Sequence, residues 1–483
     1  MTANIIVLGA TGDLTSRYLL PGLAQLRELG RPVDGLRLIG VARDELDDRG
    51  FRQRVGASLR AHAADVASRV RGELADTASY VHGDVTDPEV LAAALRTART
   101  GEHASHGDDA VVVYLALPHG LFEPVAVALG RCDLPAGVRV VVEKPFGEDL
   151  ASARRLNTVL RQVLPDDRVF RVDHFLAKQT VLNLLGLRFA NRVLEPLWSN
   201  THIAGVDIVF DETIDAQGRA SYYDHAGALR DMVQNHLLQL LTLVAMEPPL
   251  TVDPADLAVR KLDVLRAVRP IRDADVDRCT VRGRYTAGTV AGRGDEREVA
   301  SYVHGPGVDP ARGTETYAEL TVHIDNWRWS GVPFRLRTGK ALARDRREIV
   351  IRFTDVPHAI FHDRDSQCNE LRLQLDPDRM ALRLNVNGIG DPFDLEPVEL
   401  VTELARQAPS PYGQLLLAII DGDTRLSAQA AEAEESWRII EPVVDAWAAG
   451  RSPLRDYPAG SGGPAPEPDA EPEPEPDAAG PGR

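Results

Sequence analysis

The chain has 483 residues, too many for a single hydrophobic core, so two domains are expected. Its net charge of −17 argues against nucleic acid as a partner. No apolar stretch reaches the roughly 18 residues of a membrane span. The three cysteines lie far apart without CxxC spacing, which indicates neither a metal site nor a disulfide framework. No secretion signal precedes the first apolar run, so we expect a soluble cytoplasmic protein.

The first 170 residues alternate short apolar runs with stretches of helical periodicity. The predicted strands are Ile5–Leu8, Leu36–Ala42, Val111–Leu117 and Val138–Glu143, and the predicted helices lie within 15–29 and 46–70. This order is typical of a parallel sheet that is flanked by helices.

A glycine-containing turn follows the first strand and opens the first helix. Its residues include Gly9, Thr11, Gly12, Asp13 and Leu14. Glycines there let the backbone approach a pyrophosphate, and the helix N-terminus offers it free N–H groups. Arg43 follows the second strand, and a cation at that place favours the 2′-phosphate of NADP. Asp44 and Glu45 come next, so the use of NAD stays open.

From about residue 200 the apolar runs follow one another without regular helices between them. The predicted strands are Ile203–Glu212, Arg282–Thr286, Ala318–Ile324, Phe334–Thr338, Ile349–Phe353 and Leu371–Leu375. Alternation within 348–353 and 380–386 suits a largely antiparallel sheet with one covered face. The predicted helices are Ala228–Met246, Glu399–Gln407, Tyr412–Ile420 and Ala428–Trp447. Residues 458–483 cannot bury apolar surface, and we predict a disordered, acidic, proline-rich tail there.

Two short segments concentrate acids, histidines and lysine. Asp173, His174 and Lys178 fall within six positions, and Asp231 and His236 lie together just inside a predicted helix. A carboxylate in contact with an imidazole orients the ring and stabilises its protonated form, which gives a workable general base. Spacing alone leaves a structural role open for either histidine.

Lysine is rare in this chain, because only four of the 55 basic residues are lysines. In such an arginine-rich chain, each remaining lysine marks a candidate site at which a compact ammonium group is needed. The four are Lys144, Lys178, Lys261 and Lys340.

These segments resemble the glucose-6-phosphate dehydrogenase family, and the resemblance covers about residues 4–450. The matching blocks include 9–14, 114–118, 143–147, 171–178, 187–191, 195–198, 222–246 and 333–342. The resemblance implies a Rossmann domain over residues 1–172. It also implies an α+β domain over 173–457, whose large, mostly antiparallel sheet forms the interface of a homodimer, with a homotetramer left open.

The resemblance also assigns an activity and site residues. It implies oxidation of glucose 6-phosphate at C1 to 6-phosphogluconolactone with NADP. His236 would be the base and Asp173 its partner. The implied substrate contacts are Lys144, His174, Lys178, Glu212, Asp231 and Lys340, and Lys144 would also contact the cofactor. Pro145 is expected to follow a cis peptide bond. No metal is required, because a His–Asp pair can deprotonate the hydroxyl. Lys261 has no implied role.

Three departures from the family pattern stand out. Phe175 replaces a tyrosine, Arg17 is the single cation that remains in the basic run after the glycine turn, and Asp345 stands where a basic residue is common. Neighbouring arginines could replace the cation that is missing at 345. A divergent enzyme for another sugar phosphate, with relaxed use of NAD and NADP, therefore stays open. A non-catalytic paralogue is the third alternative.

Overall fold

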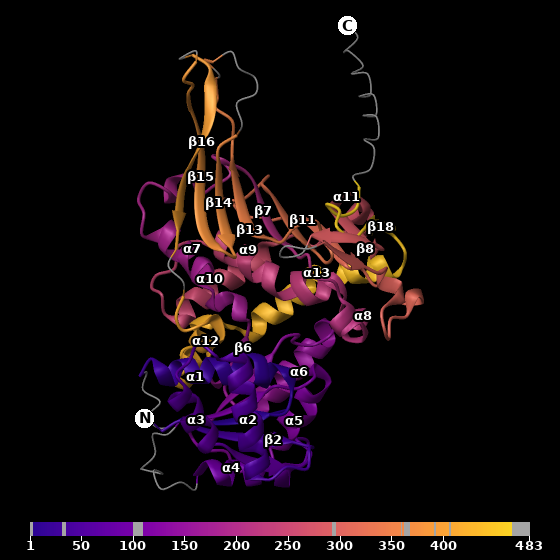
Figure 1. The fold of residues 1–483 in the computed structure, drawn as a ribbon. Coiled ribbons are helices and arrows are strands. Elements are labelled where there is room, and N and C mark those ends of the chain that lie inside the picture. The colour runs from indigo at the N-terminus through magenta and orange to yellow at the C-terminus, as the bar shows by residue number, and fades with distance from the viewer. Residues whose placement is uncertain are drawn as a thin grey trace.

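Both sheets that the sequence predicts are present in the computed structural model of the chain, one in each half of the molecule (Figure 1). The structure describes residues 3–30, 35–99, 110–291, 296–358, 360–361, 368–390, 393–404 and 407–465. Within these ranges, no helix combines the length and the apolar character that crossing a membrane requires.

The first sheet has seven strands in the order β17-β6-β5-β4-β1-β2-β3. Its strands are β1 (Ala3–Leu8), β2 (Arg37–Ala42), β3 (Ser79–His82), β4 (Ala110–Leu115), β5 (Arg139–Glu143), β6 (Val169–Val172) and β17 (Ser427–Ala428). The helices of this half are α1 (Leu20–Glu28), α2 (Asp48–His62), α3 (Ser68–Asp76), α4 (Pro88–Arg99), α5 (Phe122–Leu129) and α6 (Leu150–Val163). β1 and β4 are buried along their whole length, as central parallel strands are when helices cover both faces.

The second sheet has nine strands in the order β16-β15-β14-β13-β7-β12-β11-β8-β18. They are β7 (Ile203–Asp211), β8 (Thr280–Thr286), β11 (Tyr317–His323), β12 (Pro333–Gly339), β13 (Arg346–Phe353), β14 (Glu370–Leu375), β15 (Asp378–Asn387), β16 (Leu395–Glu403) and β18 (Leu454–Pro458). Two of its pairings, β7 with β12 and β8 with β18, are parallel and the others antiparallel. The prediction of a largely antiparallel sheet is confirmed. A separate hairpin is formed by β9 (Gly288–Ala291) and β10 (Glu296–Val299).

The predicted helix Glu399–Gln407 is wrong, because residues 395–403 form the edge strand β16. This strand pairs with β15 over nine consecutive positions, from Leu395 opposite Asn387 to Glu403 opposite Arg379. The local sequence has apolar spacing that also suits a helix. A long antiparallel partner overrides that weak preference.

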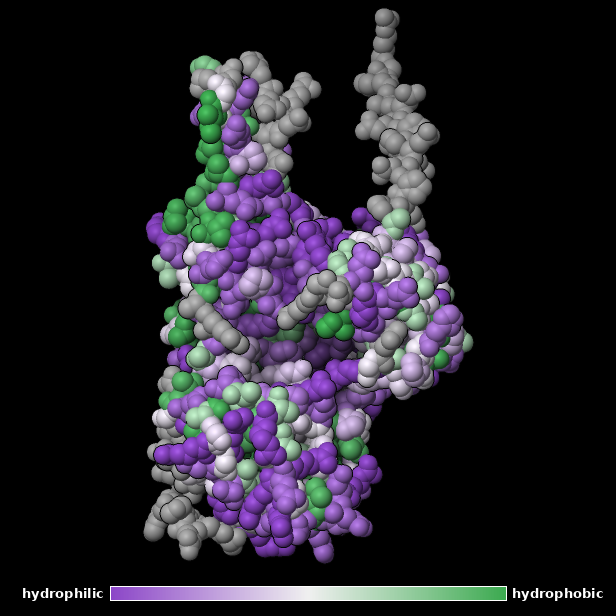
Figure 2. Space-filling view, viewed as in Figure 1, coloured by the Kyte–Doolittle hydropathy of each residue, from purple (hydrophilic) through white to green (hydrophobic). Residues whose placement is uncertain are grey.

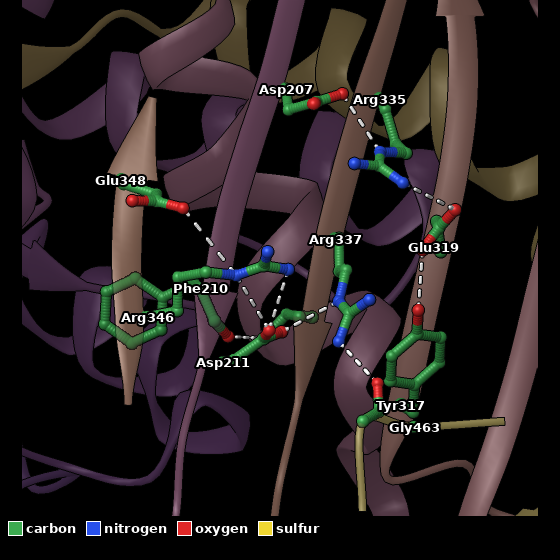
Figure 3. A network of polar contacts seen from close by, with 12 residues as sticks. Asp207, Phe210, Asp211, Tyr317, Glu319, Arg335, Arg337, Arg346, Glu348 and Gly463 are labelled. Atoms are coloured by element: carbon green, nitrogen blue, oxygen red, sulfur yellow. Dashed lines mark hydrogen bonds and ion pairs between the residues drawn. The ribbon is translucent and has the colours of Figure 1, made fainter. Parts of the chain in front are cut away.

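Helices cover one face of the large sheet and leave charged side chains on the other. The covering helices are α7 (Gln179–Phe189), α8 (Ala220–Ala228), α9 (Leu238–Ala245), α10 (Pro254–Ala267) and α13 (Ala430–Ala448), with the short α11 (Val276–Cys279) at one end. On the opposite face, Asp207 and Asp211 lie between arginines of the neighbouring strands (Figure 3). Each buried carboxylate is thereby paired with a guanidinium.

The chain returns to the first half near its C-terminal end. α12 (Pro411–Asp421) packs Leu416 and Ile420 into the core under β1 and β4, and β17 adds to the edge of β6. α13 then links both halves. The indole of Trp437 donates to the carbonyl of Phe146, and the indole of Trp447 donates to Thr280 Oγ1 beside the large sheet. The division of the chain at residue 172 stays a prediction.

Part of the predicted tail lies within the described residues. Ala459 is buried, and the backbone N–H of Gly460 donates to the carbonyl of Ala341 at 2.8 Å. Ser461 accepts a hydrogen bond from the N–H of Ala343. Residues 459–465 therefore pack beside β12, while residues 466–483 lie outside the described residues.

Lys261 has a structural place. Its ammonium lies 2.8 Å from Glu432 Oε2, and both side chains are almost fully buried between α10 and α13. The same carboxylate oxygen accepts a hydrogen bond from Gln239 on α9. The pair thus joins the helices that cover the large sheet.

Lys261→Met is expected to lower the free energy of unfolding by about 3–5 kcal/mol, because it leaves Glu432 buried without a cation. Chemical denaturation measures this change. Arg260→Met is the control, since Arg260 is partly exposed and should change stability by less than about 0.5 kcal/mol. Equal stability of the two variants would contradict this role of the buried pair.

Candidate active site

The residues proposed for catalysis meet where the two halves of the chain join. Lys144 directly follows β5 and Asp173 directly follows β6, at the carboxyl ends of neighbouring parallel strands. Asp231 and His236 come from a π-helical segment, Leu229–Leu237, between α8 and α9. Figure 2 shows a hollow between the halves with hydrophilic residues around it. Carboxyl ends of parallel strands are the usual place for ligands in such sheets.

His236 and Asp173 form a buried pair. His236 Nδ1 lies 2.6 Å from Asp173 Oδ1, and each residue is 1% exposed. Burial by itself raises the pKa of the Asp173 carboxyl, but the adjacent imidazole and its hydrogen bond lower that pKa to about 2. Burial lowers the pKa of His236 below its ordinary 6.5, although Asp173 acts in the opposite direction. At pH 7 the ring is therefore neutral, with Nδ1–H donated to Asp173 and Nε2 free to accept a proton.

The π-helical segment brings Asp231 and His236 toward one site although they are five residues apart. Its i→i+5 hydrogen bonds widen the helical turn, so residues five apart lie closer to one face than in an α-helix. Lys144 Nζ donates to the carbonyl oxygen of Asp231 at 2.8 Å and to its Oδ1 at 2.9 Å. Burial lowers the pKa of the Lys144 ammonium, but the Asp231 carboxylate raises it to a net value above its usual one. Both groups are therefore charged at neutral pH.

His174 lies beside the buried pair of His236 and Asp173. Its ring centroid is 5.4 Å from that of His236 and 5.3 Å from that of Tyr412, on which it stacks at 16°. Burial, together with the neighbouring His236, lowers the pKa of His174 to about 3. The ring is therefore neutral at pH 7 and can serve a ligand as a hydrogen-bond donor.

The remaining predicted substrate contacts lie on the large sheet and near it. Lys340, just after β12, forms an ion pair with Glu212, just after β7. Lys178 Nζ lies 5.1 Å from the ring centroid of Phe175. Lys178 also lines a separate cavity together with Asp376 and Asp378. None of these three predicted contacts lines the cavity that Lys144 and Asp231 line, but Lys340 is near enough to Asp231 to help lower the pKa of its carboxyl.

Phe175 takes part in the site through its ring. It stacks on the imidazole of His236, with ring centroids 3.9 Å apart and planes at 19°. It is 4% exposed. The apolar ring covers one face of the imidazole and contributes to the burial that lowers the pKa of His236.

The cavity next to Lys144 has a volume of about 780 Å³. Besides Lys144 and Asp231 it is lined by Pro145, Tyr222 and Arg230. The peptide bond before Pro145 is cis, as expected. The volume lies within the range of small-molecule sites.

The glycine turn has the geometry that a dinucleotide requires. Gly9 adopts φ +83°, and a Cβ atom there would lie 2.3 Å from the carbonyl oxygen of Ala116. The N–H of Gly12 donates to the carbonyl of Gly9, and helical structure begins at the next residue, Asp13. Thr11 Oγ1 donates to Asp44 Oδ2 at 2.7 Å. A side chain at residue 9 would fill the space in which the backbone bends, so the turn fits a pyrophosphate.

The other predicted cofactor residues surround this turn. Arg43 is exposed at the end of β2, next to Asp44. Asp13 pairs with Arg17 at 2.8 Å, and Leu14 lies in the first helical turn. Arg43 is thus exposed at this edge of the sheet, and Asp44 already accepts a hydrogen bond from Thr11 of the turn.

Asp173, His174 and His236 also form the group in the described chain with donor atoms suited to a metal, all within 4.8 Å of one another. Within this group, His236 Nδ1 and Asp173 Oδ1 already share a hydrogen bond. That contact needs a proton where a metal ion would lie. The arrangement therefore fits proton transfer better than coordination.

Sequence reasoning missed two residues at the site. Tyr412, at the start of α12, stacks on His174, and its position in an apolar helix gave no signal that separates it from a core aromatic residue. Glu143 directly precedes Lys144 and accepts a 2.5 Å hydrogen bond from the Tyr114 hydroxyl. Burial raises the pKa of Glu143 to about 7. Its place beside Lys144 was a signal that could have been used.

Known proteins of one family match nearly the whole chain. The family model "Glucose-6-phosphate dehydrogenase, NAD binding domain" matches residues 6–183, and "Glucose-6-phosphate dehydrogenase, C-terminal domain" matches residues 185–470. Glucose-6-phosphate 1-dehydrogenase of Mycolicibacterium smegmatis is 39% identical over 471 residues, which cover 95% of this chain and 94% of the relative. That of Treponema pallidum is 37% identical over 476 residues, which cover 95% and 92%.

Solved structures agree as well. The crystal structure of glucose-6-phosphate 1-dehydrogenase from Mycobacterium avium superposes with a TM-score of 0.83 at 38% identity and covers 96% of this chain and 95% of its own. A glucose-6-phosphate dehydrogenase in complex with its substrate glucose 6-phosphate gives a TM-score of 0.86 at 31% identity and covers 96% of both chains. The chain is an oxidoreductase and belongs to the glucose-6-phosphate dehydrogenase family.

Proposed function

We propose that His236 is the base with which this chain oxidises glucose 6-phosphate at C1 to the lactone. The observation that carries the proposal is the buried 2.6 Å contact between His236 Nδ1 and Asp173 Oδ1. Nε2 of the neutral ring takes the proton of the C1 hydroxyl, and Asp173 stabilises the imidazolium that forms. NADP, held at the glycine turn, supplies the hydride acceptor when it is bound.

The other polar groups orient the sugar. Asp231 and Glu212 accept hydrogen bonds from hydroxyl groups, and Lys144 and Lys340 hold these carboxylates in place in the free protein. On binding, each ammonium also reaches substrate oxygen atoms. His174 and Lys178 serve the phosphate end, where charge-assisted hydrogen bonds are strongest.

The direct test is a spectrophotometric assay of cofactor reduction with glucose 6-phosphate, run with NADP and with NAD. Unphosphorylated glucose and other hexose phosphates are the comparison substrates. We expect the highest kcat/KM with glucose 6-phosphate and NADP. Faster turnover of another sugar phosphate would favour the divergent enzyme, and no turnover with any of them would favour the non-catalytic paralogue.

Arg43 is expected to select NADP through its 2′-phosphate. Arg43→Ala should raise the KM for NADP about 10-fold, the effect of one exposed charge-assisted hydrogen bond, and leave the KM for NAD unchanged. Arg49→Ala, which removes an exposed charge on α2, is the matched control. Equal effects on both cofactors would contradict this role.

We propose a homodimer formed through the outer strands of the large sheet, with pairing into a tetramer left to measurement. Exposed apolar side chains gather on β15, β16 and their connection, where Figure 2 shows a hydrophobic patch. They are Val386, Ile389, Phe393, Leu400 and Val401. Such a patch on an edge strand is typical of an interface. Light scattering on the eluting protein gives the mass that decides among monomer, dimer and tetramer.

The proposed compartment is the cytoplasm. The cysteines Cys132, Cys279 and Cys368 are all free in the structure, which suits a reducing environment. Localisation of a tagged chain in its host tests this.

A further inference from the structure

The end of β5 is tied to β4 by a hydrogen bond that the proposed mechanism does not use. Tyr114 in β4 lies opposite Val141 in β5, and Glu143 follows two residues later on the same face of the sheet. The Tyr114 hydroxyl donates to Glu143 Oε1 at 2.5 Å. The Tyr114 ring is completely buried, in the core that α1 and α12 cover. Its hydroxyl is therefore a fixed point to which Glu143 is attached.

Glu143 lies between two strand ends that carry site residues. It directly precedes Lys144, and in the parallel register of β5 and β6 it lies opposite Val172, the residue before Asp173. From this point the Lys144 side chain crosses to the other half of the chain, where its ammonium donates to the carbonyl and to Oδ1 of Asp231. A displacement of Glu143 would therefore also displace the backbone from which the Lys144 ammonium extends.

The charged and titratable groups around Glu143 come from every element packed against it. Burial raises the pKa of Glu143 to about 7, against the lowering effects of the Tyr114 hydrogen bond and of Lys144, and Asp173 raises it further. Across the same space, Glu143 raises the pKa of the Tyr412 hydroxyl on α12. A carboxyl accepts a hydrogen bond both when it is ionised and when it is protonated. The contact with Tyr114 is therefore kept on either side of neutral pH.

We propose that Tyr114 and Glu143 are positioning residues for the oxidation, because their hydrogen bond fixes the end of β5 and thereby places the Lys144 ammonium against Asp231. This inference rests on the proposed function, in which Lys144 reaches the substrate. Lysine is a flexible four-carbon chain with a single point charge, so its own ion pair does not define where its backbone lies. A misplacement of about 1 Å in a substrate-positioning group can cost about 10²-fold in rate.

The experiment removes each partner of the hydrogen bond in turn. Tyr114→Phe removes the donor and is expected to lower kcat/KM for glucose 6-phosphate about 10-fold, and Glu143→Leu about 10–100-fold. Glu143→Gln keeps an acceptor for the Tyr114 hydroxyl and should stay within about 3-fold of the wild type between about pH 6 and pH 8. Tyr302→Phe is the matched control and should equal the wild type, because it removes a buried hydroxyl that donates to Asp224 Oδ1 in the other half of the molecule.

A double-mutant cycle tests whether the pair acts through Lys144. In the Lys144→Met background, Tyr114→Phe should cost less than about 2-fold, since the ammonium that the pair positions is no longer present. A similar loss in both backgrounds would show that Tyr114 only supports the fold, and would overturn the inference. A Glu143→Gln variant that loses activity only above about pH 7 would also overturn it, because the charge of Glu143 and not the hydrogen bond would then matter.

Hydrogen exchange followed by mass spectrometry separates this inference from the proposed function, because it requires no turnover. A peptide that covers residues 143–149 should exchange faster in Tyr114→Phe than in the wild type and in Tyr302→Phe. If the wild type fails to oxidise glucose 6-phosphate, the proposed function is wrong, and the exchange measurement still decides whether the hydrogen bond holds this turn. Unchanged exchange in Tyr114→Phe, or an active wild type whose kcat/KM is unchanged in Tyr114→Phe, would overturn the inference.

Discussion

Replacing His236 with asparagine is expected to lower kcat by about 10²–10⁴-fold, the contribution of a well-placed general base. Asparagine is close in size and can still hydrogen-bond to Asp173, so the pocket keeps its shape. It has no nitrogen that can accept the proton of the C1 hydroxyl. The loss should therefore fall on kcat, while the KM for glucose 6-phosphate and the affinity for NADP stay near those of the wild type.

Steady-state kinetics and NADP titration of the purified variant measure these quantities. A melting temperature close to that of the wild type shows that the fold is intact. Normal turnover of His236→Asn would mean that another group is the base. A rise in KM with unchanged kcat would instead place His236 in substrate binding.

Asp173→Asn is expected to lower kcat by about 10²-fold or more for a different reason. Asp173 accepts the Nδ1–H of His236, which leaves Nε2 unprotonated. An asparagine amide can donate to Nδ1 instead, and the ring proton then moves to Nε2, where it blocks the base. The variant also loses the charge that stabilises the imidazolium.

The pH profile distinguishes this role from a structural one. Burial holds the pKa of His236 below 6.5, so log(kcat/KM) of the wild type should stay level at neutral pH and fall only as the ring becomes protonated at lower pH. Asp173 raises the pKa of His236, so Asp173→Asn should move this acidic limb to still lower pH. A variant with a reduced plateau and an unmoved limb would contradict direct coupling between the two groups.

Local sequence signals predicted the fold where pairing partners are close in the chain or strands are buried on both faces. Continuous apolar runs such as those of β1 and β4 leave little choice other than central strands. The strand β16 was missed because its pairing with β15 defines it, while its own residues are mostly exposed. The return of α12 and β17 to the first sheet depends on contacts between residues more than 200 positions apart.

The site residues divide in the same way, into features that the sequence predicts and contacts that only the fold reveals. Asp173 and His236 could be predicted from motifs rich in acids and histidines and from the family resemblance. Their 2.6 Å contact, however, depends on a π-helical turn that the sequence does not predict. Lys261 was conspicuous only because lysine is rare, and a buried carboxylate explains it.

The helix α13 is attached to both halves of the chain, and this limits how the enzyme can be divided into fragments. Its two indoles anchor it to Phe146 in one half and to Thr280 in the other, while α12 completes the core beneath the first sheet. An isolated N-terminal fragment that ends near residue 172 would leave that core open to water. The two halves therefore cannot be exchanged independently between relatives. A chimera must take its N-terminal half and the C-terminal segments that pack on it from the same parent.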